Sequence, residues 1–218
     1  MREKTYVVNM VKDVGKKTAM EAQLASHPEL DWQFWIAVEG RKLTPEQQSE
    51  MILPAFKERY GRLASLPAAG CSLSHISIYR DMVANDISHA LILEDDARLQ
   101  SDLHLDEIKT LLETDRPVAV LLTPDFWHTT TPISKIDNKH RIFPVYDGYM
   151  TSGYMINKAA ARLLIKHIYP VQYTADAWEI FISFGLHLFG VVPHMISYPE
   201  GLGEIGLSQK NNDEPIIL

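Results

Sequence analysis

Three consecutive acidic residues, Glu94-Asp95-Asp96, directly follow the apolar run 90–93. Such a run is typical of a strand buried on both faces, and ligands of open α/β sheets bind at the carboxyl ends of the strands. Carboxylates crowded there repel one another and are costly to desolvate, so a hard divalent cation is the simplest compensation. Alternate residues of an extended chain point the same way, so we expect Glu94 and Asp96 to face one site and Asp95 another direction. The alternative is that the acids only end the strand, solvated or beside Arg98.

The segment 70–75, which reads Gly-Cys-Ser-Leu-Ser-His, opens a helix predicted over residues 70–85. Free backbone N–H groups at a helix start and the hydroxyl of Ser74 are suited to receive an anion. His75 is suited to hydrogen-bond a ligand or the acids. The alternative is structural, because Cys71 and His75 share an apolar stripe and His75 can be a satisfied core histidine.

Two acidic side chains late in the chain, Asp176 and Glu179, are candidates for a general base. They are three residues apart in a helix predicted over residues 174–184, which would place them on one helical face. Such a base belongs to a different segment from the cation-binding acids, on the acceptor side of the site. The alternative is a pair of acids that stabilises a helix N-terminus.

His194, after a late predicted strand, is either a further metal ligand or a surface histidine.

The elements that would position these side chains alternate between strand and helix, which favours an α/β domain with a largely parallel central sheet. Residues 123–151 are polar and interrupted by proline, so we expect a long functional loop there. Its aromatic residues, Trp127, Tyr146 and Tyr149, are either a wall for a sugar ring or anchors of the loop. Strands are predicted over residues 5–10, 32–38, 90–93, 117–122, 152–156 and 187–192, and helices over 16–25, 70–85, 160–167, 174–184 and after the capping residue Thr44.

Composition limits the classes of protein that the chain can form. Its 218 residues predict one domain, and 46% hydrophobic with 22% charged residues excludes wholesale disorder and coiled coil. A net charge of −7 argues against a nucleic-acid binder, which needs a basic face. With a single cysteine and no run of 18 apolar residues, we expect a soluble cytoplasmic protein whose contact with the inner membrane is at most peripheral. Three glycines predict a flexible tail over about residues 201–218.

These segments together resemble glycosyltransferase family 25, the bacterial lipooligosaccharide galactosyltransferases and the related collagen galactosyltransferases. The specific part of the match is the pair Gly-Cys-x-Leu-Ser-His at 70–75 and Leu-Glu-Asp-Asp at 93–96. Weaker matches are Tyr-Val-Val-Asn-Met at 6–10, Ala-x-x-Gly at 37–40 and Ser-Gly-Tyr-Met-Ile at 152–156. Two positions depart from the family pattern. Pro-Ala-Ala precedes Gly70 in place of Gly-Glu-Ile, and Lys12, Lys16 and Lys17 stand where the family tends to carry an arginine.

The resemblance implies a GT-A fold, a UDP-sugar donor with galactose as the expected sugar, inversion at the anomeric carbon, and a requirement for Mn²⁺ or Mg²⁺. The acceptor would be lipooligosaccharide, lipopolysaccharide or another glycan or lipid-linked saccharide. The acids 94–96 would take the place of the family's metal and donor motif, and Asp176 would match its late aspartate. The resulting roles are metal binding by Asp96, Glu94 and His194, donor contacts by Ser74, His75, Glu94, Asp95, Gly153 and Tyr154, and base catalysis by Asp176 or Glu179.

Two rival classes of function remain open. A non-catalytic nucleotide-sugar or carbohydrate-binding protein would retain the fold without turnover, and the missing Gly-Glu ahead of Gly70 favours this rival. Another metal-dependent enzyme would also use acids at a strand end. Against a phosphohydrolase, the chain lacks an Asp-x-Asp-x-Thr pattern, and against a nucleotidyltransferase, it lacks a glycine-rich loop after the first strand.

Overall fold

The computed structural model describes residues 2–101 and 103–199, and the tail predicted over residues 201–218 lies outside the described residues. No helix in these two ranges is long and apolar enough to cross a bilayer. The strands are β1 (Glu3–Asn9), β2 (Leu30–Ile36), β3 (His89–Glu94), β4 (Arg98–Leu99), β5 (Val118–Leu121), β6 (Phe126–His128), β7 (Ser134–Lys135), β8 (Arg141–Gly148), β9 (Gly153–Asn157), β10 (His187–Val192) and β11 (Ile196–Ser197). The helices are α1 (Val14–Leu24), α2 (Pro45–Met51), α3 (Pro54–Tyr60), α4 (Leu66–Ala84), α5 (Asp106–Leu112), α6 (Lys158–Ile168) and α7 (Trp178–Ser183), with short 3₁₀ turns η1 (Gly40–Lys42) and η2 (Gly61–Leu63).

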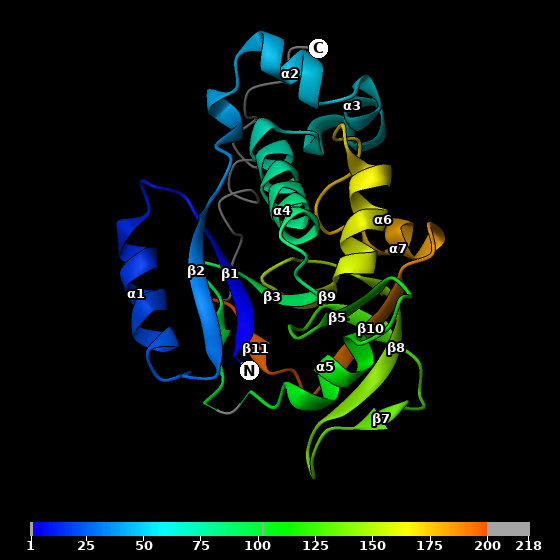
Figure 1. The fold of residues 1–218 in the computed structure, drawn as a ribbon. Coiled ribbons are helices and arrows are strands. Elements are labelled where there is room, and N and C mark those ends of the chain that lie inside the picture. Colours follow the sequence, from blue (N-terminus) through cyan, green and yellow to red (C-terminus); the bar gives the residue numbers. More distant parts are fainter. Residues whose placement is uncertain (1, 102, 200–218) are drawn as a thin grey trace.

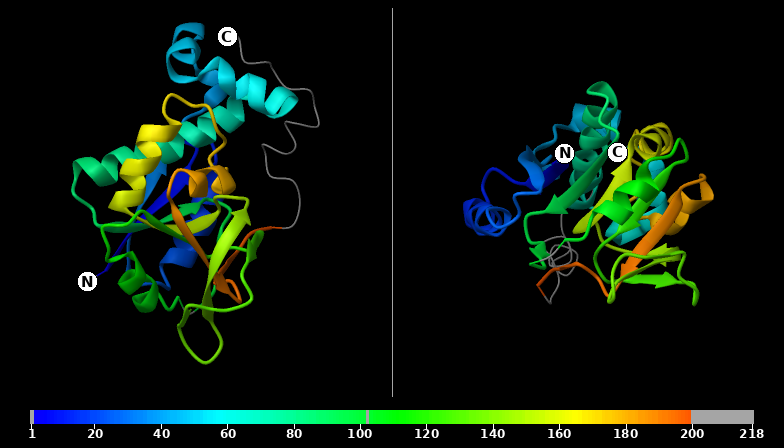
Figure 2. Two further views of the ribbon diagram at one scale, coloured as in Figure 1. Left: turned by 90° about the vertical axis from the view of Figure 1, so that its right-hand side faces the viewer. Right: turned by 60° about the horizontal axis from the view of Figure 1, so that its bottom comes forward.

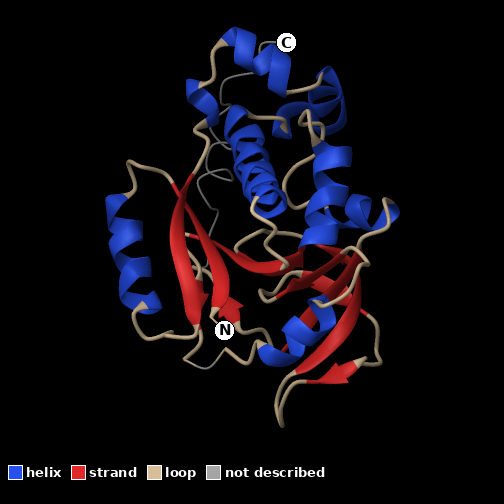
Figure 3. Cartoon of the chain, in the orientation of Figure 1, coloured by secondary structure: helices blue, strands red, loops and turns tan. Residues whose placement is uncertain are grey.

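A nine-stranded sheet forms the centre of the molecule, and helices cover both of its faces (Figures 1 and 3). The strand order is β2-β1-β3-β9-β5-β10-β8-β6, with β7 paired to β8. A second, two-stranded sheet joins β11 to β4. The predicted α/β class is therefore confirmed.

The central sheet is mixed, so the prediction of a largely parallel sheet is wrong. β2, β1 and β3 run parallel, as do β5 and β10, but β9 runs antiparallel between β3 and β5. The apolar runs indicated burial on both faces of the sheet, which does not fix strand direction. Strand direction depends on how the chain enters each strand. Here the carbonyl of Ser152, just before β9, accepts a hydrogen bond from the amide of Glu94, the last residue of β3, at 3.1 Å. The chain thus enters β9 at the edge where it leaves β3.

Successive residues of the central strands face two separate hydrophobic cores, as the period of two requires. Tyr6 and Tyr154 belong to the core beneath α4 and α6, whereas Val7 and Met155 belong to the core beneath α1 and α5. All four side chains are fully buried. Figure 2 shows α4 and α6 side by side on one face of the sheet. The polar groups at the strand ends are therefore held between two packed layers.

Residues 123–151 form strands where the sequence predicted a loop. β6, β7 and β8 pair antiparallel and extend the sheet beyond β10. Pro144 lies inside β8 opposite Phe189 of β10, and a proline within a run normally argues against a central strand. Trp127 and Tyr149 contact each other edge to face with ring centroids 5.6 Å apart. The two rings, like that of Tyr146, are half exposed.

Two helix predictions had opposite outcomes. Thr44 caps α2 as predicted, since its hydroxyl accepts a hydrogen bond from the Gln47 amide at 3.3 Å. The helix predicted over residues 174–184 starts only at Trp178, so Asp176 and Glu179 do not share a helical face. The Asp176 carboxylate instead accepts the amide hydrogen of Met150 at 3.1 Å. This contact ties the segment before α7 to the chain that enters β9.

Helix α4 begins at Leu66, earlier than predicted, and approaches the backbone after β2 very closely. A Cβ added to Gly70 would lie 2.6 Å from the carbonyl oxygen of Val38 and 2.7 Å from the amide nitrogen of Gly40. Both neighbours are backbone atoms that cannot move aside like a flexible side chain. The absence of a side chain at position 70 therefore sets how α4 sits over the ends of the parallel strands.

We predict that Gly70→Ala lowers the free energy of unfolding by about 1–3 kcal/mol, the usual effect of overpacking, despite the better helix propensity of alanine. Gly15→Ala is the matched control, because Gly15 also lies in a helix but a Cβ there would meet nothing within 4 Å. The control should be neutral or gain about 0.5–1 kcal/mol. Chemical denaturation of both variants measures the difference, and equal stability of the two would contradict the close approach.

Candidate functional site

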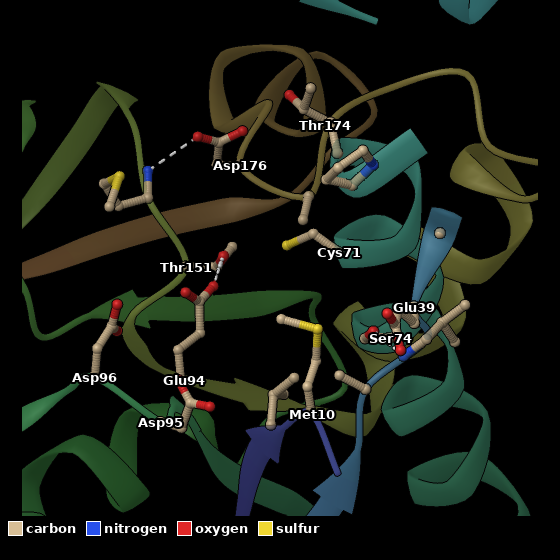
Figure 4. A pocket seen from close by; sticks show the side chains of 18 of the residues that line it. Met10, Glu39, Cys71, Ser74, Glu94, Asp95, Asp96, Thr151, Thr174 and Asp176 are labelled. Carbon is tan, nitrogen blue, oxygen red and sulfur yellow. Dashed lines mark hydrogen bonds between the residues drawn. The ribbon is translucent and has the colours of Figure 1, made fainter. Parts of the chain in front are cut away.

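A pocket of about 490 Å³ opens at the carboxyl ends of the three parallel strands β2, β1 and β3. Met10 and Val38 line it from the chain after β1 and β2, and Glu94 lines it from the end of β3. Cys71 of α4 and Asp176 before α7 form the opposite side (Figure 4). The pocket therefore collects segments from across the whole chain at the edge of the sheet where ligands are expected.

The three consecutive acids divide between two directions. Figure 4 shows the carboxylates of Glu94 and Asp96 on one side of the backbone and that of Asp95 turned away from them. Asp95 accepts a hydrogen bond from the side-chain amide of Asn9 at 2.8 Å and lies 3.3 Å from the ammonium of Lys16. Asp95 therefore points away from the other two acids, although β3 ends at Glu94 and both aspartates lie in the turn after it. Asp95 is occupied by protein partners.

Glu94 is held by groups from two other elements. The hydroxyl of Thr151, just before β9, donates a short hydrogen bond to its carboxylate, and His75 Nε2 of α4 lies 3.6 Å from the same oxygen. Burial by itself raises the pKa of Glu94, but the neighbouring His75 imidazole and the Thr151 hydroxyl outweigh burial and lower it below the ordinary value. Glu94 is therefore ionised at neutral pH.

A chain of hydrogen bonds continues beneath Glu94 into the core. His75 Nδ1 is 2.7 Å from the hydroxyl of Tyr154, which is 2.7 Å from the hydroxyl of Tyr79. All three side chains are buried. His75 is therefore a buried core histidine held through Nδ1, its Nε2 lies near Glu94 without a hydrogen bond, and the residue is not part of the pocket lining.

Asp96 has the environment that favours a bound cation. Its Oδ1 is buried and has no hydrogen-bond partner among the described residues. Burial, and then the charge of Glu94, raise the pKa of Asp96 from 3.8 to about 6. Two oxygen-donor side chains with one unsatisfied oxygen suit a hard divalent cation such as Mn²⁺ or Mg²⁺. The residues at this end of β3 thus fit the metal that the sequence predicted.

Asp176 faces the pocket from the side opposite β3 (Figure 4). The Met150 amide donates to its Oδ2 at 3.1 Å, and the Met150 carbonyl in turn accepts the indole N–H of Trp178 at 3.0 Å. Trp178 is fully buried, so this pair of contacts anchors Asp176 to the core. The carboxylate is thereby held in the pocket and in a different segment from Glu94 and Asp96.

Basic side chains line the mouth of the same pocket. Lys12 and Lys16 follow β1, and Arg41 lies in η1 after β2. Three cations beside clustered acids are suited to bind a phosphate group. Sequence reasoning missed Arg41, although it directly follows the Ala-x-x-Gly segment of residues 37–40. Thr151, the hydroxyl partner of Glu94, was also missed and has no distinguishing signal in the sequence.

Several residues predicted for donor contacts lie elsewhere or are already occupied. Ser74 lines the pocket, but its hydroxyl donates to the Gly70 carbonyl at 2.7 Å and accepts the Val38 amide hydrogen at 2.8 Å. Gly153 and Tyr154 are buried in β9 and are not part of the pocket lining. The segment 70–75 lies inside α4, so the free helix N-terminus expected there is wrong.

The structure does not bring Glu179 or His194 into the pocket lining. Glu179 is exposed in the first turn of α7. His194 lies between β10 and β11, where its carbonyl accepts a hydrogen bond from Gln100 at 2.7 Å. Within the described part of the chain, the one group of three or more potential metal-ligating side chains with ligand atoms within 4.8 Å is instead Cys71, His75 and Glu94.

The site thus combines carboxylates and basic side chains at the carboxyl edge of an α/β sheet. Comparison with known proteins identifies the family to which the chain belongs. The model of glycosyltransferase family 25, described as an LPS biosynthesis protein, matches residues 2–178, and the chain belongs to this family. The predicted family is thus confirmed.

Relatives of known description are distant in sequence. A protein of Acanthamoeba polyphaga mimivirus described as a glycosyltransferase is 24% identical over 203 residues, which cover 88% of this chain and 61% of that protein. Human procollagen galactosyltransferase 2 is 21% identical over 220 residues, which cover 90% of this chain and 35% of that protein. A human family member described as inactive is 28% identical over 104 residues, 46% of this chain and 17% of that protein. This chain therefore spans about a third to three fifths of the first two relatives.

We predict that, without divalent cations, Asp96→Asn raises the melting temperature at pH 7.5 by about 2–4 °C, the shift that about 1 kcal/mol produces. The raised pKa means that the folded wild type loses stability as pH rises from about 4 through about 6, and asparagine removes this loss. At pH 4 the two proteins should melt together. Thermal denaturation from pH 4 to 8 tests this, with the exposed Asp115→Asn as control, and an equal difference at both ends of that range would contradict it.

Proposed function

We propose that this chain transfers a sugar, galactose in our expectation, from a UDP-sugar to a lipooligosaccharide, lipopolysaccharide or other glycan acceptor. The observation that carries the proposal is the pocket with Glu94 and Asp96 on one wall and Asp176 on the other. An inverting displacement needs a carboxylate opposite the leaving diphosphate, and the two walls supply carboxylates to both sides of one cavity. The single-step inversion is part of the proposal.

Glu94 and Asp96 would hold a divalent cation, Mn²⁺ or Mg²⁺, through oxygen ligands. When bound, such a cation stabilises negative charge that develops on a departing phosphate. Lys12, Lys16 and Arg41, which line the same pocket, would bind and orient the diphosphate. Asp95 contributes by holding Lys16 through their 3.3 Å ion pair.

Asp176 would accept the proton of the acceptor hydroxyl. Its Oδ2 is fixed by the Met150 amide, and Trp178 fixes Met150, so the remaining oxygen is oriented without help from substrate. A base that is already in position reduces the ordering required when the acceptor binds. Glu179, the alternate base predicted from sequence, is exposed outside the pocket lining, so we use it as a control residue and not as a candidate base.

Galactose and the class of acceptor are supported by the names of relatives. Two kinds of description appear, LPS biosynthesis for the family model and procollagen galactosyltransferase for a human relative. We infer a glycan acceptor from these names, and peripheral contact with the inner membrane where the acceptor is lipid-linked. A cytoplasmic location remains part of this proposal.

A second candidate function is a binding protein without turnover. It is favoured by the human family member described as inactive and by Pro67-Ala68-Ala69 in place of the usual Gly-Glu-Ile. Pro67 and Ala68 both line the pocket, so the missing glutamate would have stood at the site itself. UDP release from UDP-sugars, measured with Mn²⁺ and candidate acceptors, decides between the two functions.

We predict that Asp176→Asn lowers kcat by on the order of 10² or more while the Kd of UDP changes little, because asparagine retains an acceptor for the Met150 amide but cannot take a proton. Glu179→Gln is the matched control, and it should leave kcat within about twofold because its side chain is exposed outside the pocket. Steady-state UDP release and calorimetric UDP binding provide the measurements. Near-normal turnover in Asp176→Asn would reject Asp176 as the base.

We also predict that EDTA abolishes UDP release, that Mn²⁺ restores it, and that Asp96→Asn lowers kcat/KM by about 10² or more at saturating Mn²⁺, because one of two oxygen-donor carboxylates is lost. Asp115→Asn, a change of an exposed residue outside the pocket lining, should behave as wild type. Full activity in EDTA would remove the metal from the mechanism. Full activity of Asp96→Asn would remove this residue from the metal site.

A further inference from the structure

Three side chains of different chemistry meet where α4 faces the end of β3. The Sγ of Cys71, a ring nitrogen of His75 and a carboxylate oxygen of Glu94 all lie within 4.8 Å of one another. Cys71 and His75 are one helical turn apart, so both project from the same face of α4 toward Glu94. We propose that Cys71, His75 and Glu94 form a binding site for Zn²⁺, separate in ligand chemistry from the oxygen ligands of Glu94 and Asp96.

The imidazole of His75 presents its Nε2 to this site. His75 is 1% exposed, and its buried Nε2 has no hydrogen-bond partner among the described residues. That nitrogen lies 3.6 Å from Glu94 Oε1, too far for a good hydrogen bond but suited to two ligands of one metal ion. The Tyr154 hydroxyl, 2.7 Å from Nδ1, fixes the ring as an outer partner does for a metal-bound histidine.

Cys71 supplies the ligand that selects for zinc. Its side chain lines the pocket, so a metal ion can reach the sulfur from solvent (Figure 4). Thiolate and imidazole ligands favour Zn²⁺ over Mn²⁺ and Mg²⁺, which prefer oxygen. Binding forms an S–Zn bond and releases the thiol proton to solvent, with no change of oxidation state.

The separation of the His75 and Glu94 ligand atoms matches that of a tetrahedral zinc site. Zinc bound at about 2.0–2.1 Å to nitrogen and about 2.3 Å to sulfur separates its ligand atoms by about 3.4–3.6 Å. His75 Nε2 and Glu94 Oε1 are already 3.6 Å apart, and the Cys71 Sγ lies within 4.8 Å of a ring nitrogen of His75 and a carboxylate oxygen of Glu94.

Glu94 belongs to both sites, so Zn²⁺ and the hard cation exclude each other. Zinc at Cys71 and His75 draws the Glu94 carboxylate away from Asp96 and leaves one oxygen-donor side chain for Mn²⁺. Zn²⁺ therefore inhibits sugar transfer in competition with Mn²⁺. This consequence rests on the proposed function, whereas zinc binding itself does not.

Co²⁺ is the probe for the binding claim, because thiolate ligation gives it a charge-transfer absorption band that oxygen and nitrogen ligation do not. The full chain, reduced and free of metal, should show this band on addition of Co²⁺, and Zn²⁺ should abolish it. Cys71→Ser should lack the band and bind Zn²⁺ at least 10-fold more weakly in competition with a chelator. His187→Gln, a change on an exposed histidine in β10, is the control and should match wild type.

Circular dichroism confirms that each variant is folded before titration. Absence of the band in wild type, or equal Zn²⁺ affinity in wild type and Cys71→Ser, overturns the zinc site, whatever the protein's activity. Displacement of bound Mn²⁺ by one equivalent of Zn²⁺, followed by electron paramagnetic resonance, tests the competition without substrate. Retention of Mn²⁺ on the zinc-loaded protein overturns the competition, and absent UDP release with an intact cobalt band rejects only the proposed function.

Discussion

An ionised carboxylate at the end of a buried strand is the constraint on which this site depends. Glu94 is the last residue of β3, after four buried apolar residues, and its carboxylate lines the pocket. Burial alone would disfavour its charge there. The charge is kept by Thr151 and His75, which come from the entry to β9 and from α4. The charge of Glu94 thus depends on α4, which supplies His75, and on the direction of β9, which places Thr151 beside it.

The antiparallel β9 between β3 and β5 meets this requirement. Because β9 starts where β3 ends, the residues just before it, Met150 and Thr151, lie over the pocket instead of at the far edge of the sheet. Met150 then links Asp176 to the same edge through its amide. A parallel strand in this place would begin at the opposite edge, and neither Glu94 nor Asp176 would have its present partner.

Close backbone packing completes the arrangement. Gly40 and Gly70 let α4 touch the segment after β2, since a Cβ on Gly40 would lie 1.7 Å from the Leu66 carbonyl oxygen. This contact sets the height of α4 over the strand ends, and with it the distance from Cys71 and His75 to Glu94. The departure from the family pattern just before Gly70 therefore lies at a tightly constrained part of the fold.

The sequence by itself determined the buried strand that ends in Glu94, the cap of α2 by Thr44, the alternation of strands and helices, and the family. These depend on local patterns of apolar spacing, capping and turn chemistry, which a single sequence carries. Tertiary structure alone decided the direction of β9, the strands within residues 123–151, and the choice of Asp176 over Glu179 as the acid facing the pocket. The direction of β9 and the placing of Asp176 depend on contacts between segments far apart in the chain, such as the bond from Met150 to Asp176, and β8 is fixed in the sheet by its distant partner β10. Local periodicity does not record such partners.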